Sequence, residues 1–299
     1  MTGSVDDRDL PQLCTAAAEI LDAATPEFLS GMGAPRSIEK GGNDFATEMD
    51  LILERRLTTE LTAATGIGVH GEEFGGDDPG TGLRWLVDPI DGTFNYSQGL
   101  PLAAMLVALV SDGVPVIGLT WLPATGQRFA AVRGGPLLIG GRTAPSLTPT
   151  TLDGGAVGYV SFQASARGRF PGPQRTRIQT ELVRRHARVR IHGSTGADMA
   201  FVAGGQLNGA VSYGRNAWDH AAGVVLVRAA GGVATDLFGR PWTVGMPSML
   251  AGDPGVHAEL MEIIDAGDWP ERPEPTGDGE VPETSGAGTN NPDSRKGRE

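Results

Sequence analysis

One segment, Trp85-Leu86-Val87-Asp88-Pro89-Ile90-Asp91-Gly92-Thr93, limits the fold and function of this chain more than any other. Its apolar beginning predicts a strand, and Asp88-Pro89 is expected to break that strand because proline fixes φ and cannot donate a ladder hydrogen bond. A second carboxylate follows at Asp91, on a turn that Gly92 makes tight. Two acids held this close suit a divalent cation far better than a packed core. The segment therefore predicts metal ions that hold a phosphate.

The bulk composition narrows the class of protein. The chain has 299 residues, 39% of them hydrophobic, which is enough for one large domain or two of ordinary size with a sizeable core. The formal net charge is -12 at pH 7, so we expect no nucleic-acid partner, because such binding depends on Lys and Arg that neutralise phosphates. If the substrate is itself anionic, bound metal would offset the repulsion.

Features that the sequence lacks exclude further classes. The single cysteine, Cys14, excludes a disulfide scaffold and a Cys-rich zinc site, and we expect it to be buried in a helix. Residues 1–7 are polar and acidic, unlike a signal peptide. The longest apolar runs, such as 102–110, are too short to span a bilayer. We therefore expect a soluble, cytoplasmic protein with no membrane partner.

The first half of the chain predicts two helices followed by an antiparallel meander. Helical spacing of apolar residues predicts a helix over 10–29, and a second helix should follow a cap at Ala46-Thr47. Asp50 would lie in its first turn, either as a surface acid that complements the helix N-terminus or as a functional residue. Strands are predicted at 67–70, 84–87, 100–110, 114–121 and 127–132, with an Asp-Gly hairpin turn at 111–113.

The second half alternates between the two kinds of element. The pattern predicts strands at 156–160, 189–191, 209–212 and 233–235, and helices at 177–186, 197–203, 218–230 and 256–264. Residues 134–149 form a loop-rich connection, and a mobile loop is expected at 164–173. We therefore divide the chain into an N-terminal metal-binding α+β subdomain, a C-terminal α/β subdomain that completes the site, and a disordered acidic tail, at 1–145, 146–266 and 267–299.

Two further acidic motifs flank the opening segment. Gly71-Glu72-Glu73 follows a short strand, where Glu72 taken alone could simply be solvated, and Trp218-Asp219-His220 opens an apolar helix. Oxygen ligands without paired Cys or His indicate a hard cation, Mg²⁺ or Mn²⁺ rather than zinc. Two such ions ~4 Å apart can clamp the attacking and leaving oxygens of an in-line displacement. His70 and His220 lie beside these motifs, and Asp236 follows the strand predicted at 233–235. We expect structural roles for all three.

Taken together, the motifs resemble the inositol monophosphatase family, whose members are magnesium-dependent and often lithium-sensitive phosphatases. They are Gly71-Glu72-Glu73, Asp88-Pro89-Ile90-Asp91-Gly92-Thr93 and Trp218-Asp219-His220-Ala221-Ala222-Gly223, in the family's order. The resemblance covers residues 10–264. It implies an α/β fold, layered as an αβαβα sandwich, with an antiparallel sheet in the first half and a smaller mixed sheet in the second. The site would lie at their junction.

The resemblance also implies which groups hold the ions. Glu72, Asp88 and the Ile90 carbonyl would hold the first ion. Asp88 would bridge to a second ion, which Asp91 and Asp219 also hold. Glu72 would contact a third ion through one oxygen and a water. The cofactor implied is Mg²⁺, with Mn²⁺ as a substitute, and Li⁺ and Ca²⁺ are expected to inhibit.

Catalytic and substrate contacts follow from the same resemblance. The hydroxyl of Thr93, paired with Asp50, would orient and deprotonate the attacking water, with Glu72 as the third catalytic residue. The N–H groups of Gly92 and Thr93 would face the phosphate, as N–H groups at helix starts often do. The full set expected to contact phosphate or substrate is Ile90, Asp91, Gly92, Thr93, Gly193, Ser194, Thr195 and Asp219.

The chain departs from the family pattern at the substrate end. Seven residues before Asp219, inositol phosphatases carry a glutamate that binds an inositol hydroxyl, and this chain has Ser212 there. Arg215, three residues on, could contact a second anionic group or could be a solvated surface residue. A site that hydrogen-bonds a hydroxyl discriminates strongly, so the loss of that carboxylate weakens the assignment to inositol.

We therefore predict a Mg²⁺-dependent phosphomonoesterase that hydrolyses a small phosphorylated metabolite similar to inositol monophosphate. Histidinol phosphate, a nucleoside 3',5'-bisphosphate and fructose bisphosphate are alternative substrates within the superfamily. A different class is also open, in which the chain is a non-catalytic sensor of a phosphorylated ligand. The family usually dimerises, so a homodimer is a further expectation from the resemblance.

Overall fold

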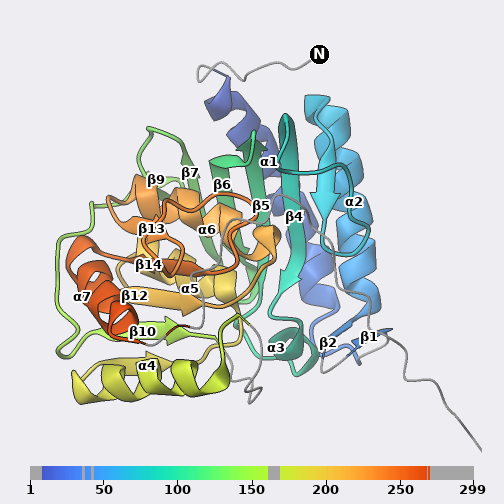
Figure 1. Cartoon of the computed structure of the whole chain (residues 1–299). Helices are drawn as coiled ribbons and strands as arrows, with labels where there is room; N and C mark the ends of the chain where they lie inside the picture. Colours follow the sequence, from blue (N-terminus) through green and yellow to red (C-terminus); the bar gives the residue numbers. More distant parts are fainter. Residues whose placement is uncertain (1–8, 36–37, 42–43, 161–168, 268, 270–299) are drawn as a thin grey trace, which may run out of the picture.

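Helices and sheets alternate in five layers in the computed structural model, which describes residues 9–35, 38–41, 44–160, 169–267 and 269 (Figure 1). Helices α1 and α2 cover one face of a seven-stranded sheet, and α5 and α6 lie between that sheet and a five-stranded one. Helices α4 and α7 cover the outer face of the second sheet. This confirms the predicted αβαβα sandwich.

The first half builds the larger sheet. Its helices are α1 (Leu10–Ser30), α2 (Glu48–Thr65), the short α3 (Thr93–Ser97) and the 3-10 turn η1 (Pro123–Thr125). A small hairpin, β1 (Ile38–Gly41) and β2 (Asp44–Ala46), precedes α2. The sheet runs in the order β3 (Val69–Gly71), β4 (Leu83–Asp91), β5 (Ala104–Ser111), β6 (Val114–Leu122), β7 (Gln127–Val132), β8 (Leu138–Ile139) and β9 (Arg142–Thr143). All neighbours are antiparallel except β3 and β4.

The second half builds a smaller mixed sheet, as predicted. Its elements in chain order are β10 (Ala156–Tyr159), α4 (Gly172–Arg184), β11 (Arg188–Arg190), α5 (Thr195–Ala203), β12 (Gly209–Ser212), α6 (Ala217–Ala229), β13 (Val233–Thr235), β14 (Met249–Gly252) and α7 (Pro254–Asp265). The strand order is β11-β10-β12-β14-β13. The first three strands are mutually parallel, and β14 is antiparallel to both of its neighbours.

The two halves share one hydrophobic core. Strand β5 is apolar up to Val110 because both of its faces are buried: Val107 packs toward α1 and α2, whereas Leu106 packs toward α5 and α6. Met199 of α5 and Val224 of α6 join Leu106 in the middle cluster. The junction that carries the candidate site is therefore held by packing from both sides.

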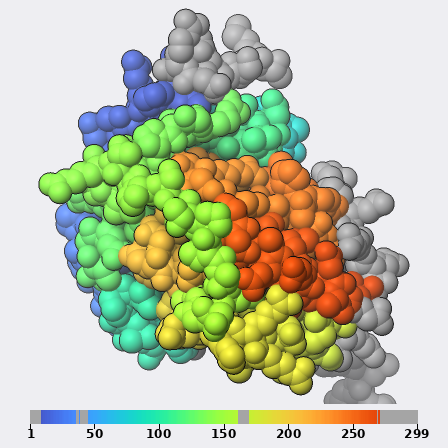
Figure 2. Space-filling model, turned by 90° about the vertical axis from the view of Figure 1, so that its left-hand side faces the viewer, coloured from blue at the N-terminus to red at the C-terminus, as the bar shows by residue number. Residues whose placement is uncertain are grey.

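The connection between the halves is anchored at several points. The backbone N–H of Leu147 donates to the carbonyl of Ala230 at 2.7 Å, and the N–H of Thr150 donates to Asp253 Oδ1 at 2.8 Å. Figure 2 shows this green segment crossing the face of the molecule beside α7. The loop-rich stretch predicted at 134–149 contains β8 and β9 and then lies against the second half.

Several sequence predictions differ from the structure. Strand β4 does not break at Asp88-Pro89 but continues to Asp91. Strand β14 and the β8–β9 pair were not predicted, and α4 begins five residues before the predicted start at 177. Residues 164–168 of the loop predicted at 164–173 lie outside the described residues, and 172–173 belong to α4; most of the tail is also outside them. Within that tail, however, Trp269 is placed: its indole N–H donates to the carbonyl of Ile264 at 2.8 Å.

Candidate metal and phosphate site

The site is built around a β-bulge in β4. Asp88 pairs with Leu106 of β5 and Asp91 pairs with Ala104, so Pro89 and Ile90 together oppose a single residue. Side chains alternate between the faces of a strand, so two residues three apart normally point opposite ways. The extra residue in the bulge turns Asp91 to the same face as Asp88. Both carboxylates then point toward α5 and α6, and both are buried.

Gly92 lets the chain leave the bulge. Its φ of 88° lies in the left-handed region, and α3 begins at the next residue, Thr93. A Cβ at Gly92 would lie 3.0 Å from the carbonyl oxygen of Leu102 and 3.1 Å from that of Gly193. A side chain is therefore disfavoured here both by conformation and by the close approach of the second half.

Asp88 is the electrostatic centre of the site. Burial raises the pKa of its carboxyl well above the usual value, and four other carboxylates raise that pKa further, in the order Glu72, Asp91, Asp219 and Asp50. Its Oδ1 accepts a hydrogen bond from the N–H of Ile90 at 3.0 Å. The fold thus brings the acids of the three motifs close together, and Asp50 joins them from a fourth stretch of the chain.

This donor set fits a hard divalent cation. A buried carboxylate among other carboxylates is costly unless positive charge compensates it. The groups are oxygen donors only, which Mg²⁺ prefers. As the side chains lie, no three His, Cys, Asp or Glu residues in the described ranges are gathered into a group that could hold a metal ion. The fit therefore rests on the buried charge and on the chemistry of the donors.

Asp91 is held by the beginning of α5. Its Oδ2 accepts hydrogen bonds from the Ser194 hydroxyl and from the N–H of Gly196, both at 2.6 Å, and its Oδ1 accepts one from the N–H of Thr195 at 3.2 Å. Burial raises the pKa of Asp91 to about 6, although these three donors act to lower it. Ser194 and Thr195, which the resemblance placed at the substrate, therefore donate to Asp91 here.

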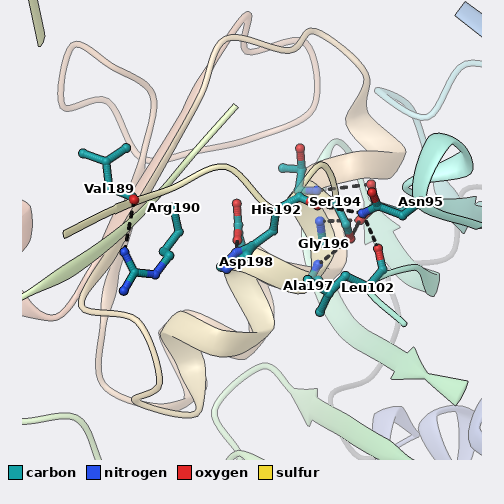
Figure 3. Close-up of polar contacts among 11 residues, drawn as sticks. Asn95, Leu102, Val189, Arg190, His192, Ser194, Gly196, Ala197 and Asp198 are labelled. Carbon is teal, nitrogen blue, oxygen red and sulfur yellow. Dashed lines mark hydrogen bonds and ion pairs between the residues drawn. The ribbon is translucent and has the colours of Figure 1, made fainter. Parts of the chain in front are cut away.

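A second contact fixes this junction beside Asp91. The side-chain amide of Asn95, in α3, donates to the carbonyls of Leu102 at 2.7 Å and His192 at 2.6 Å. Figure 3 shows Asn95 beside Ser194 and Gly196, which come from the other half of the chain. Ser194 also caps α5 by accepting a hydrogen bond from the N–H of Ala197 at 3.2 Å. The predicted substrate turn, 193–195, is thus fixed to the bulge.

Thr93 and Asp50 meet at the opposite side of the bulge. The Thr93 hydroxyl lies 3.0 Å from the Ile90 carbonyl and 3.4 Å from Asp50 Oδ1. Asp50 Oδ2 accepts hydrogen bonds from the N–H of Thr47 at 2.8 Å and from its hydroxyl at 2.6 Å. Asp50 is fully buried, so the alternative of a surface acid is wrong, although it does belong to a capping box at the start of α2.

Two predicted ligands lie at the ends of elements beside Asp88. Glu72 follows β3 and is half-buried, and its backbone N–H donates to the carbonyl of Val87 at 3.2 Å. Asp219 lies in the first turn of α6 and is also half-buried. The helix start favours a negative charge there.

The residues at the substrate end have mixed surroundings. Ser212, which stands where a family glutamate is expected, is buried and lies 2.9 Å from Nε2 of His220. A Cβ at Gly214 would lie 3.6 Å from Asp219 Oδ2, so the segment after β12 adjoins the acids. Arg215 is exposed in this segment. Serine here supports a buried histidine instead of presenting a carboxylate.

The residues expected to be structural behave as such. His220 is buried, and burial lowers its pKa to about 4; His70 stacks on Trp218 with ring centroids 5.8 Å apart. Asp236 accepts hydrogen bonds from the backbone N–H groups of Phe238 and Arg240 within a turn. Cys14 is buried in α1. These observations confirm the structural roles predicted for them.

One residue that sequence reasoning missed is Glu54. It is fully buried on α2 and accepts hydrogen bonds from the backbone N–H groups of Glu73 and Phe74, each at 2.8 Å. Burial is the main cause that raises its pKa to about 7, against the two N–H groups, which lower it. Its position four residues after Asp50, on the same helix face, was the available signal.

A layered αβαβα sandwich with acids gathered at the junction of its sheets defines the class of protein, and sequence comparison gives the family. Residues 9–266 match the model of the inositol monophosphatase family, so the chain belongs to that family. The expectations drawn from the three motifs, of this family and of the phosphoric monoester hydrolase class, are thereby confirmed.

Individual relatives cover nearly the whole chain. It is 53% identical over 271 residues to the inositol-1-monophosphatase ImpA of Mycolicibacterium smegmatis, covering 91% of this chain and 98% of the relative. It is 54% identical over 252 residues to the probable inositol 1-monophosphatase ImpA of Mycobacterium tuberculosis, covering 84% and 93%. A crystal structure of the extragenic suppressor protein suhB from Bartonella henselae has the same fold, with a TM-score of 0.76 at 24% identity, over 85% of this chain and 100% of that one.

Of the expectations about membranes, the structure bears only on the one that no apolar segment spans a bilayer. Within the ranges that the structure describes, no helix combines the length and the apolar character needed to cross a bilayer.

Proposed function

We propose that this chain is a Mg²⁺-dependent phosphomonoesterase that hydrolyses inositol monophosphate or a closely similar small ester. The observation that carries the proposal is the burial of Asp88 among Glu72, Asp91, Asp219 and Asp50. Excess buried negative charge next to a helix start and a bulge calls for cations, and cations would in turn attract a phosphate. Membership of the inositol monophosphatase family supports the same reaction class.

The groups that would hold the ions are carboxylates and one carbonyl. They are Glu72, Asp88, Ile90, Asp91 and Asp219. When bound, divalent ions neutralise charge on the phosphoryl group and make a water more acidic. Mn²⁺ is the expected substitute for Mg²⁺, and inhibition by Li⁺ and Ca²⁺ stays a prediction.

Thr93 and Asp50 would handle the proton of the attacking water. The single proton of the Thr93 hydroxyl faces two acceptors, the Ile90 carbonyl at 3.0 Å and Asp50 Oδ1 at 3.4 Å; when it is donated to Asp50, the lone pairs of the hydroxyl can accept a hydrogen bond from a water. Asp50 Oδ1 would take the proton through Thr93, while Oδ2 stays bound to Thr47. Glu72 would position a second water. Because Asp50 is held by the capping box, its carboxylate is fixed before substrate arrives.

The choice of inositol 1-phosphate as the substrate has less support than the proposed reaction has. Two relatives with more than 50% identity have inositol 1-monophosphatase in their names. The buried Ser212 bound to His220, however, gives an inositol hydroxyl no carboxylate at that position. The contacts proposed for phosphate and substrate are those of Gly92, Thr93 and the turn at 193–195. A cytoplasmic location and a homodimer stay predictions from the sequence.

A second candidate substrate is an ester with another charged group. Ser212 and the exposed Arg215 favour it, since an arginine beside the acids could pair with a second anion. Fructose 1,6-bisphosphate and adenosine 3',5'-bisphosphate carry such a group, and histidinol phosphate carries a cation instead.

A panel assay tests both the reaction and the substrate. Phosphate release is measured from inositol 1-phosphate, histidinol phosphate, adenosine 3',5'-bisphosphate and fructose 1,6-bisphosphate, each with Mg²⁺ and with EDTA. We expect release from inositol 1-phosphate to exceed release from the others and to stop in EDTA. Equal release in EDTA would contradict metal dependence, and no release from any ester would favour the sensor.

A further inference from the structure

Glu54 is an unusual residue for its place in the fold. Glutamate is almost never fully buried in proteins unless it is paired, and Glu54 is fully buried near the middle of α2. It lies four residues after Asp50, so both side chains leave the same face of the helix. That face points toward the site, because Asp50 reaches Thr93.

The Glu54 carboxylate accepts hydrogen bonds from the two residues after Glu72 and lies against the residue before it, Gly71. Its Oε2 accepts from the N–H of Glu73 and its Oε1 from the N–H of Phe74, each at 2.8 Å. On the other side, a Cβ at Gly71 would lie 2.0 Å from Oε1 and 2.3 Å from the carboxyl carbon. The absence of a side chain at 71 is what leaves space for the carboxylate.

We propose, resting on the function proposed above, that Glu54 is a positioning residue that fixes the loop 71–74 so that Glu72 is presented to the cation. The geometry supports a carboxylate for this task. Two N–H donors converge on its two oxygens, and an amide side chain could accept only one of them. Nothing in the arrangement gives Glu54 contact with the substrate, so its effect is transmitted through the loop backbone.

Helix α2 then links two parts of the machinery. Its first turn holds Thr93 through Asp50, and the next turn holds the Glu72 loop through Glu54. The residue that would activate the attacking water and the residue that would bind the ion are thus set by one rigid element. Substitution of a residue that orients a metal ligand typically lowers metal affinity or activity by about 10- to 100-fold.

The test compares Glu54→Gln with a control at Asp253. Asp253 is also a buried carboxylate that accepts backbone hydrogen bonds, from Gly255 at 3.0 Å and Val256 at 3.1 Å, but it caps α7 in the outer layer of the second sheet. Mg²⁺ binding is measured by titration calorimetry on the full chain, and kcat is measured as a function of Mg²⁺ concentration. Amide hydrogen exchange at residues 73 and 74 is followed without metal.

We expect Glu54→Gln to weaken Mg²⁺ binding by about 10- to 100-fold, while kcat at saturating Mg²⁺ falls much less. Exchange at residues 73 and 74 should be faster. Asp253→Asn should lower Tm but leave Mg²⁺ affinity unchanged, which separates positioning from general loss of stability.

Gly71→Ala supplies a second variant. Its new methyl group would displace the Glu54 carboxylate, so it should reproduce the weaker Mg²⁺ binding even if Glu54→Gln fails to fold. The double variant should bind no more weakly than the worse single variant, because both remove one interaction.

Unchanged Mg²⁺ affinity in Glu54→Gln, or an equal loss in Asp253→Asn, would overturn this inference alone. A wild-type protein that binds no Mg²⁺ would overturn the proposed function and this inference with it.

Discussion

Asp88 and Asp91 are both buried, lie on the same face of one bulge and differ sharply in their surroundings. Around Asp88 the fold gathers Glu72, Asp219 and Asp50, so negative charge faces negative charge. Around Asp91 it gathers three hydrogen-bond donors from the start of α5. The buried charge of Asp88 therefore needs a cation to balance it. The buried charge of Asp91 is stabilised mainly by hydrogen bonds from the protein.

The surroundings of Asp88 serve the proposed reaction, whereas those of Asp91 also join the two halves of the molecule. The Asp88 side needs positive charge for its proposed function, because Asp88 is buried and other carboxylates lie around it. The Asp91 side would bind an ion and also ties β4 to α5, so it contributes to stability as well. Identical substitutions at the two acids should therefore change stability in opposite directions.

Asp88→Asn is expected to have the largest effect on activity. The variant should lower kcat by about 100-fold or more, since bound ions supply several kcal/mol of charge stabilisation. In EDTA its Tm should rise above that of the wild type, because a buried charge among like charges is removed while the N–H of Ile90 keeps an acceptor. Phosphate release and thermal unfolding in EDTA measure the two effects. A lower Tm in EDTA would contradict our view of this region.

Asp91→Asn should also abolish most activity but should lower stability. An asparagine cannot accept from Ser194, Thr195 and Gly196 together, and a buried donor left without a partner costs about 1–3 kcal/mol. Urea unfolding in EDTA measures the loss of unfolding free energy. If Asp91→Asn and Asp88→Asn raise stability equally, the two regions do not differ as we describe.

Ser194→Ala should have the smallest effect of the three. It removes one of three donors to Asp91 and the cap of α5, and the loss of such a cap costs about 0.5–2 kcal/mol. The backbone N–H groups of Thr195 and Gly196 remain, so kcat should stay within about tenfold of the wild type. Urea unfolding and steady-state kinetics report both values. A loss of activity as large as that of Asp91→Asn would show that the hydroxyl itself acts in the reaction.

Much of the site could be predicted because its chemistry is concentrated in short motifs. Asp88, Asp91 and Gly92 lie within five residues, and local rules for Pro and Gly already indicate a turn. The hairpin at 111–113 is equally local. Asp112 and Gly113 both have positive φ, as a two-residue hairpin requires.

The remaining features depend on partners distant in sequence. The bulge at Pro89-Ile90 exists only relative to the register of β5, so the sequence pattern predicted a break instead. Strand β14 is four apolar residues long, too short for periodicity to distinguish strand from helix. Glu54 shares a helix face with Asp50, but the sequence gives no sign of what buries it, because residues 73 and 74 reach it only in the folded chain.

The central claim is that Asp88 and the carboxylates gathered around it hold divalent cations. Titration calorimetry of Mg²⁺ into the wild type, Asp88→Asn and Ser194→Ala tests it most directly. We predict that the wild type and Ser194→Ala bind Mg²⁺ and that Asp88→Asn does not. Binding by Asp88→Asn with wild-type affinity, or no binding by the wild type, would contradict the claim.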